Sequence, residues 1–583
     1  MSQYADVVFG GGALYTSDSS GRRLIPPTAA DGRPATSAAV RGGVIVAVGD
    51  AADGAITDLK GPRTELVDLR GRALLPGFQD AHVHPAFAGV TMIGCNLIGA
   101  ATLAEAEGRI EAYAAAHPEK EWISGSGWRM EWFEHGTPSR HQLDRLTGGR
   151  PSFLTNRDGH GGWANTRALE LAGFGAGTPD PPDGRFERED DGTLQGAVHE
   201  GAADLVGAFV PKPTFEERLA GLLLAQRHLH ERGVTAWQDA IVGPYLGSQD
   251  PLPVYLAAAG SGQLTARVQG ALWWERGRGA EQIDELRERR ETGQAGRFRA
   301  NTVKIMQDGV AENFTAGMLE PYLDACGCQT TSRGLSHVDP EELRAHVSAL
   351  DALGFQVHCH AIGDRAVREC LDALAAARAA NGSNDHRHHI AHLQVVHPDD
   401  MPRFARLGVT ANMQALWAAH EPQMDELTIP FLGPGRSARQ YLFGDLLRSG
   451  ARLAAGSDWA VSSANPLRAI HVAVNRSLHE SSGAQAEPLL PGQALDLAEA
   501  MAACTIGSAY VNHLDDVTGS IEPGKLGDLD RARPGPVRAA GGGDRRGDGA
   551  GHLCAGDRRP PVAPARMTAT VPSSGRCGCP QGR

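Results

Sequence analysis

The sequence predicts an α/β protein built around a closed barrel of eight parallel strands, because a helix followed by a strand recurs along the chain with short links. Segments 213–240 and 339–361 each contain a helical pattern, a glycine stop and an apolar strand that ends in a polar residue. Segments 397–415 and 440–460 repeat this order. Eight strands can be assigned, which favours a barrel over an open sheet. They lie near 78–84, 234–239, 267–273, 302–308, 355–360, 388–393, 409–414 and 452–458.

Polar residues recur at one register position in these units. Counting six residues on from the glycine that ends three of the helices leads to Asp239, His360 and Gln414. Counting eight from Gly450 leads to Asp458, and an even step keeps the side chain on the same face. A buried polar group costs free energy unless it has a partner. Because the carboxyl ends of barrel strands converge, the register predicts a functional site at this end.

The residue types at these strand ends suit a metal centre. The first strand ends in "DAHVHP", which places His82 and His84 on one face. Lys304 lies inside an apolar strand with Asp308 on its face, and His392 ends the sixth strand. Imidazole and carboxylate are donors that suit Zn²⁺ and its neighbours.

Several phrases in this order resemble the amidohydrolase superfamily, and more closely its family-3 type, which includes proteins similar to N-substituted formamide deformylase. The phrases are "LLPGFQDAHVHP", "NRDGHGGWANTRALELAG", "VKIMQDG", "VHCHAIGDRAV", "RHHIAHLQVVHPDD" and "AAGSDWAV". The resemblance runs from about residue 4 to Leu529. It implies a (β/α)8 metal-dependent hydrolase barrel of the TIM type, a small composite β-sandwich domain and an insertion after the first barrel strand.

The resemblance also implies roles for individual residues. It assigns a first metal to His82, His84 and Asp458 and a second to His360 and His392, with Lys304 bridging them once it is carbamylated. The alternative for Lys304 is a buried pair with Asp308. One departure is Ala391, where the family commonly has Glu. The expected catalytic residues are Asp458, His392 and Lys304. The expected substrate-binding residues are His358, His160, Gln414 and Asp239. Two alternatives stay open: His358 lies one layer behind the metal ligands, and His160 is a capping or loop-packing histidine.

The predicted activity is hydrolysis of a non-peptide, amide-type C–N bond of a small molecule by a metal-activated hydroxide. One or two divalent ions are expected, with Zn²⁺ favoured by the donor set. Two alternatives remain open: a deaminase that acts on an aminated ring carbon, and a non-catalytic metal-binding protein of the same fold.

The composition bounds the partners of the chain. The net charge of −13 argues against nucleic acid or a membrane surface, and no apolar run approaches the ~20 residues of a membrane span. We expect no signal peptide, and nine scattered cysteines favour a reduced, cytoplasmic setting. The expected partner is the small-molecule substrate, and a homo-oligomer is left open.

Domain boundaries follow from the pattern of elements. Residues 1–75 are expected to begin the β-sandwich, 76–510 to form the barrel with an insertion at about 95–212, and 511–529 to return to the sandwich. Residues 530–583 are rich in Gly, Pro and Arg, which predicts a disordered tail or the product of a frameshift after Leu529.

In the insertion, segment 175–193 has a loop composition. An apolar lid over the barrel mouth is expected from four aromatic residues: Trp128, Trp132, Phe133 and Trp163.

Overall fold

The computed structural model describes residues 3–29, 32–245, 248–479 and 487–531. Its centre is a sheet of eight parallel strands in the order β23-β22-β21-β20-β19-β17-β16-β9, with the two-residue β18 (Gln294–Ala295) antiparallel to β19. The predicted barrel is confirmed. Its strands are β9 (Phe78–Val83), β16 (Val234–Val242), β17 (Arg267–Trp273), β19 (Phe298–Met306), β20 (Gln356–Ala361), β21 (His389–His392), β22 (Thr410–Met413) and β23 (Arg452–Ala455).

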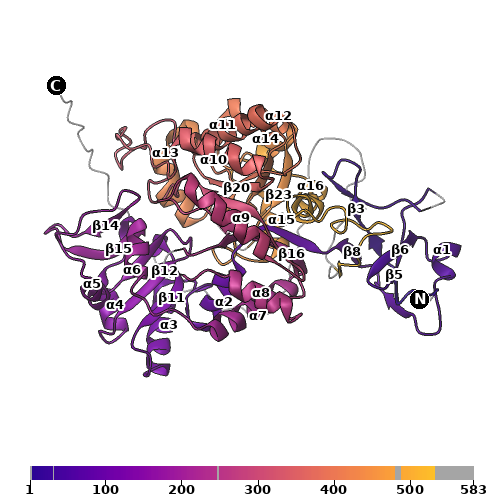
Figure 1. Cartoon of the computed structure of the whole chain (residues 1–583), viewed down its shortest axis with the longest axis horizontal. Coiled ribbons are helices and arrows are strands. Elements are labelled where there is room, and N and C mark those ends of the chain that lie inside the picture. The colour runs from indigo at the N-terminus through magenta and orange to yellow at the C-terminus, as the bar shows by residue number, and fades with distance from the viewer. Residues whose placement is uncertain (1–2, 30–31, 246–247, 480–486, 532–583) are drawn as a thin grey trace.

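Helices cover the outside of the barrel (Figure 1). The sequence specifies their ends: Asp339 accepts hydrogen bonds from two amides of the first turn of α10, and Thr214 and Glu217 form a capping box on α7. The helices are α2 (Pro85–Ile93), α7 (Phe215–His230), α8 (Leu252–Gly260), α9 (Ile283–Thr292), α10 (Pro340–Ala352), α11 (Asp364–Asn381), α12 (Met401–Leu407), α13 (Ile429–Ser437), α14 (Phe443–Arg448), α15 (Pro466–Asn475), α16 (Leu497–Ala502) and α17 (Ser508–Val511).

The barrel closes between β23 and β9 through a turn rather than a strand ladder. The prediction carried the last strand to Asp458, but β23 ends at Ala455, and Asp458 lies in the following turn at φ +53°. Its amide donates to the His82 carbonyl at 2.8 Å, and the His84 amide donates to the Trp459 carbonyl at 2.8 Å. The closing turn therefore holds Asp458 beside the two histidines of β9.

The segment between α2 and α7 forms a sheet of its own, in the order β10-β11-β12-β13-β15-β14. One expectation was wrong: the loop-like segment 175–193 contains β14, because Phe186 is buried and pairs with Val198 across the strands. The elements are β10 (Cys95–Asn96), α3 (Leu103–Ala116), β11 (Ile123–Trp128), α4 (Arg140–Leu146), β12 (Ser152–Asn156), β13 (Gly161–Ala164), α5 (Thr166–Ala172), β14 (Gly184–Arg188), β15 (Leu194–Glu200) and α6 (Gly201–Gly207).

A small β unit lies at the opposite end of the molecule from this insertion (Figure 1). One sheet has the order β6-β5-β1-β7, a second has β2-β8-β24, and β3 pairs with β4. The predicted tail from residue 530 lies outside the described residues except for Asp530 and Arg531, which belong to β24. The elements are β1 (Val7–Gly10), β2 (Ala13–Leu14), β3 (Thr16–Ser17), β4 (Leu24–Ile25), β5 (Ser37–Arg41), β6 (Val44–Gly49), α1 (Gly54–Thr57), β7 (Glu65–Asp68), β8 (Ala73–Pro76) and β24 (Leu529–Arg531).

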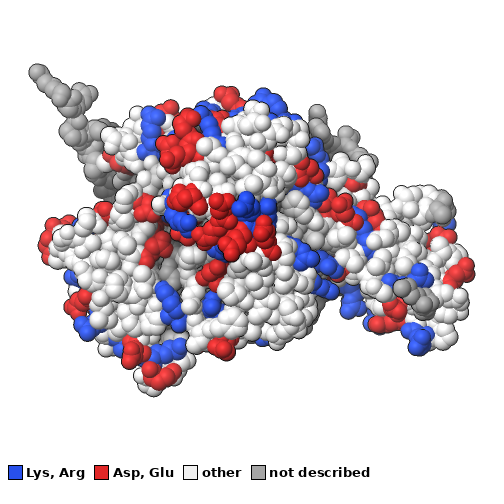
Figure 2. Space-filling model, viewed as in Figure 1, with Lys and Arg blue, Asp and Glu red and all other residues white. Residues whose placement is uncertain are grey.

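The visible surface carries both signs of charge, with a band of acidic side chains across its middle (Figure 2). Within the described residues, no helix combines the length and the apolar character that a membrane crossing requires.

Candidate metal centre

The centre begins with the two histidines of β9. His82 is 1% exposed and lies in the strand, while His84 immediately precedes α2, whose first residue is Pro85. An Asp458 carboxylate oxygen lies 2.9 Å from Nε2 of His84 and 3.4 Å from Nε2 of His82. The three ligand atoms lie within 4.8 Å of one another, which is compact enough for one ion.

Hydrogen bonds determine which nitrogen of His82 carries its proton. The Gln238 Oε1 atom can only accept, so it accepts from Nδ1–H of His358 at 2.7 Å. Nε2 of His358 then accepts from Nδ1–H of His82 at 2.9 Å. Burial lowers the pKa of His82 to about 3, so its ring is neutral. A bare nitrogen lone pair of His82 therefore faces the Asp458 carboxylate.

The electrostatics of Asp458 agree with this arrangement. Burial alone would raise its pKa, but the neighbouring His82 and His84 hold the pKa well below the usual range. The group is therefore a carboxylate at neutral pH. An anion and a nitrogen lone pair repel each other at this distance unless a cation lies between them.

His360 and His392 extend the centre from two neighbouring strands. Nδ1 of His360 is 3.1 Å from Oδ1 of Asp308, which leaves the other ring nitrogen of His360 for a ligand. His392 ends β21, and its ring stacks on Trp417 at 5.4 Å. Its Nδ1 atom is buried, has no hydrogen-bond partner in the described part of the chain, and lies 3.8 Å from Oδ2 of Asp458. Burial lowers the pKa of both histidines well below the usual value, so both rings are neutral, the form that binds metals.

Lys304 lies inside the barrel and is 2% exposed. Burial lowers its pKa to about 7, although Asp458 acts in the opposite direction. Its Nζ atom lies 3.4 Å from Nε2 of His358. Asp308 instead accepts from His360 and from the amides of Gly317, Ile362 and Gly363. The alternative of a buried Lys304–Asp308 pair therefore has no contact to support it among the described residues.

The four expected substrate-binding residues separate into two groups. His358 and Gln414 are buried behind the ligands and lie outside the cavity lining: His358 orients His82, and Gln414 Oε1 accepts from the His392 amide at 2.6 Å. Asp239 and His160 do line the cavity. Asp239 accepts from the Tyr255 hydroxyl at 2.6 Å, and burial raises its pKa to about 6.

His160 reaches the centre from the turn between β12 and β13 of the insertion. Its Nδ1 atom is 2.8 Å from the buried carboxylate of Glu200, and its ring lies 5.5 Å from that of His360. Arg276 contacts the other oxygen of Glu200 at 3.4 Å. Burial by itself would lower the pKa of His160, but Glu200 raises it above the usual value.

Sequence reasoning missed Glu200 and Asp80. Asp80 was within its reach, because it lies two residues before His82 and so shares its face. Its carboxylate accepts from the amides of His82 and Ser457 and so holds the closing turn against β9. Glu200 had no such signal, since its ion pair with His160 joins positions 40 residues apart.

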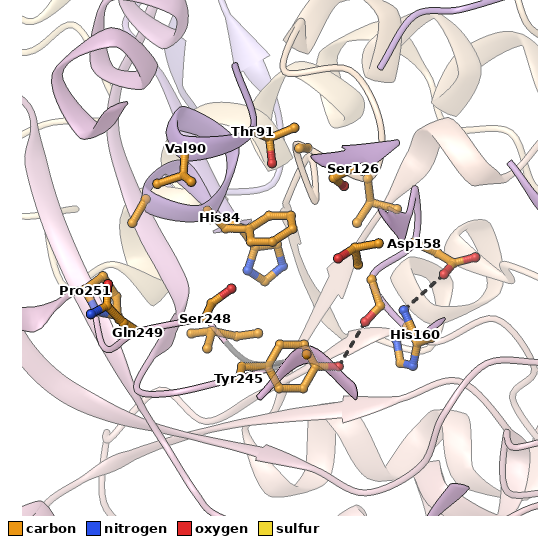
Figure 3. Close-up of a pocket in the computed structure, with 18 of the residues that line it drawn as sticks. His84, Val90, Thr91, Ser126, Asp158, His160, Tyr245, Ser248, Gln249 and Pro251 are labelled. Carbon is orange, nitrogen blue, oxygen red and sulfur yellow. Dashed lines mark hydrogen bonds between the residues drawn. The ribbon is translucent and has the colours of Figure 1, made fainter. Parts of the chain in front are cut away.

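A cavity of about 240 Å³ opens onto these ligands. Figure 3 shows His84 in its middle, with α2 on one side and the turn that carries Asp158 and His160 on the other. The expected aromatic lid was wrong for Trp128 and Trp163. Both are fully buried in the core of the insertion, where Trp128 packs against Phe133, and none of the four aromatic residues of the expected lid lines the cavity.

Similarity to known proteins agrees with this geometry. The sequence pattern of the amidohydrolase family matches residues 65–530. The chain belongs to the amidohydrolase family. The resemblance predicted from the sequence is thereby confirmed at the level of the family.

Individual relatives span most of the chain. The protein LONG AFTER FAR-RED 3 of Arabidopsis thaliana is 32% identical over 536 residues, which cover 90% of this amidohydrolase and 86% of that protein. N-substituted formamide deformylase of Arthrobacter pascens is 26% identical and covers 84% and 88% of the two chains. The fold matches that of an uncharacterized metal-dependent hydrolase from Pyrococcus furiosus, with a TM-score of 0.67 and 24% identity over 91% of this chain and 100% of the other.

Proposed function

We propose that this amidohydrolase cleaves an amide-type C–N bond of a small molecule by hydrolysis that depends on a divalent metal of the zinc class. The observation that carries the proposal is the lone pair on Nε2 of His82, which lies 3.4 Å from a carboxylate oxygen of Asp458. Nδ1 of His392, which has no hydrogen-bond partner among the described residues, lies 3.8 Å from the other oxygen. Such an arrangement is stabilised by a cation and is costly without one.

Two sets of residues would hold the metal. His82, His84 and Asp458 would bind one ion, and His360 and His392 a second. The lowered pKa of Lys304 leaves part of it as a neutral amine near pH 7. That amine can attack CO₂, forming an N–C bond and losing one proton, and the resulting carbamate supplies two oxygens between the two sets.

The roles of the protein groups follow from their positions. When bound, the metal lowers the pKa of a water molecule towards about 7 and polarises the substrate carbonyl. The Asp458 carboxylate borders the cavity, so it accepts the proton of the attacking water and later delivers it to the leaving nitrogen. His160 and Asp239 face the same space and orient the substrate. The amide bond is suggested by the N-substituted formamide named for the relative from Arthrobacter pascens.

The test is a panel of N-formyl and N-acyl amines, together with aminated ring compounds that a deaminase would use. We expect release of an amine from at least one amide, loss of turnover after chelation and recovery with Zn²⁺ or Co²⁺. The His82→Ala variant should lose both the metal, measured by elemental analysis, and the activity. Turnover by protein without bound metal would contradict the proposal, and turnover of the ring compounds alone would replace it with deamination.

A further inference from the structure

We infer that the substrate carries an extended apolar substituent, alkyl or aryl, which binds in the part of the cavity between α2 and α8. The inference deepens the proposed function and rests on it for the position of the scissile bond beside His84. It comes from the unequal chemistry of the two sides of the cavity.

The two sides can be compared in Figure 3, where Val90 and Pro251 lie on one side of His84 and Asp158 and His160 on the other. On the second side, His160 and Asp158 present an imidazole and a carboxylate, and the guanidinium of Arg157 beside them contacts Gln423 and Glu421. This side offers hydrogen bonds to a polar group. It therefore suits the polar end of an amide substrate rather than a hydrocarbon.

The first side is walled mainly by apolar side chains. Phe87 and Val90 come from α2, Ile241 from β16, Val254 from α8, and Val210 from the segment after α6. Apolar surface of this kind lowers the free energy of a bound hydrocarbon group by removing it from water. The polar lining residues labelled on this side in Figure 3 are Thr91, Ser248 and Gln249.

Two cationic side chains, Lys212 and Arg218, also border this side, but each donates a hydrogen bond to a backbone carbonyl of the protein. Nζ of Lys212 donates to the Gly207 carbonyl at 2.9 Å, and Arg218 donates to the Asp250 carbonyl at 2.8 Å. Lys212 and Gln249 are exposed, so this side leads to solvent. A long substituent can extend towards the opening, whereas the opposite side limits the substrate to a compact polar end.

The experiment measures binding of the separate halves of the substrate, so it does not require turnover. Isothermal titration of the metal-loaded protein would use butylamine and hexylamine as one pair and butanoate and hexanoate as another. Two additional methylene groups should tighten binding about tenfold in one of the pairs, since each buried CH₂ contributes about 0.8 kcal/mol. The pair that responds reveals whether the apolar substituent belongs to the amine or to the acyl part.

Variants of Val90 locate the effect. Val90→Asp should weaken binding of the responding hexyl compound at least tenfold, and Val90→Thr, which preserves the shape, should weaken it several-fold. Val517→Asp and Val517→Thr repeat the exchanges at a 41% exposed valine outside the cavity lining and should leave binding unchanged. If the exchange to Asp disturbs folding, the Thr variants still allow the binding comparison to be made.

The inference would be overturned if the binding affinity did not depend on chain length in either pair. It would also be overturned if glutarate bound more tightly than all of these probes, because that result would indicate recognition of an anion by Lys212 and Arg218. Dependence on chain length without hydrolysis of any amide in the panel would retain the apolar subsite and reject the proposed function.

Discussion

Two clusters of histidine and aspartate lie at opposite ends of the barrel strands. His82, His84 and Asp458 lie at the carboxyl ends, and Asp351, His386 and His388 lie before the starts of β20 and β21. Each cluster places its ligand atoms within 4.8 Å of one another. Their residue types are the same, so composition and distance alone do not distinguish them.

The hydrogen bonds do distinguish them. In the cluster of Asp351, His386 and His388, called the lower cluster below, Nδ1 of His388 accepts from the Val357 amide. The proton of His388 must therefore be on Nε2, which donates to Asp351 at 2.9 Å. Asp351 also accepts from His386 and Asn381. Each of these contacts joins a donor to an acceptor, so the Asp351 carboxylate is satisfied without a cation. In the cluster at the carboxyl ends, His84 also contacts the carboxylate at 2.9 Å, but Nε2 of His82 presents a lone pair to Asp458, and the cluster opens onto a cavity. A cation would stabilise this arrangement.

The largest effect that would test this contrast is expected from Asp458→Asn. The amide retains an oxygen for the metal but cannot accept the proton of the attacking water. Hydrolysis should fall about 10²–10⁴-fold while much of the metal remains, as measured by steady-state kinetics and elemental analysis of the same preparation. Activity within tenfold of the wild type would remove Asp458 from the proton transfer.

Lys304→Ala should have the next largest effect, because it removes the bridging group between the two proposed ion positions. We expect one metal ion per chain instead of two, and partial recovery of metal and turnover when acetate or propionate is added. Anomalous diffraction that shows both positions filled in the alanine variant would rule out a bridging role.

The His358→Phe variant tests whether the orientation of His82 by His358 distinguishes the two clusters. The aromatic ring fills the space but cannot accept from His82, whose orientation and tautomer are then no longer determined. Removal of such a partner typically lowers metal affinity or activity about 10–100-fold. His386→Phe makes the same exchange in the lower cluster and should leave metal affinity unchanged; an equal loss in both variants would show that the two clusters do not differ in this way.

The smallest effect on activity is expected from Asp351→Asn. It should leave metal content and turnover unchanged and lower the free energy of unfolding at pH 7 by about 1–3 kcal/mol, because buried donors lose a charged acceptor. Burial alone would raise the pKa of Asp351, but hydrogen bonds from His388, Asn381 and His386 lower it below 3.8. The stabilisation is therefore complete above pH 3.8 and disappears as the pH falls through the lower pKa of the folded state.

Denaturant titrations at pH 7 and pH 3 measure this dependence. The difference between wild type and Asp351→Asn should be smaller at pH 3. A difference that grows towards low pH would contradict the role assigned to Asp351, and loss of metal in this variant would reassign the lower cluster as a binding site.

The sequence by itself determined the barrel and the strand ends from which the candidate metal ligands project. Those predictions depend on local periodicity, helix caps and the two-residue alternation of strands, which act over a few residues. They brought His82, His84, His360, His392 and Asp458 to one end of the molecule. The two-residue alternation also predicted that Asp458 ends a strand. That prediction was wrong, because Asp458 lies in a turn at positive φ.

Only the tertiary structure decided which polar residues face the cavity and which lie behind it. His358 shares its face with His360, yet Gln238 and His82 occupy both of its ring nitrogens, and these partners come from other strands. The ion pair between His160 and Glu200 joins the turn after β12 to the end of β15 in the same way. Such contacts depend on how distant segments pack together. The periodicity within one strand does not predict which other strand will lie opposite it.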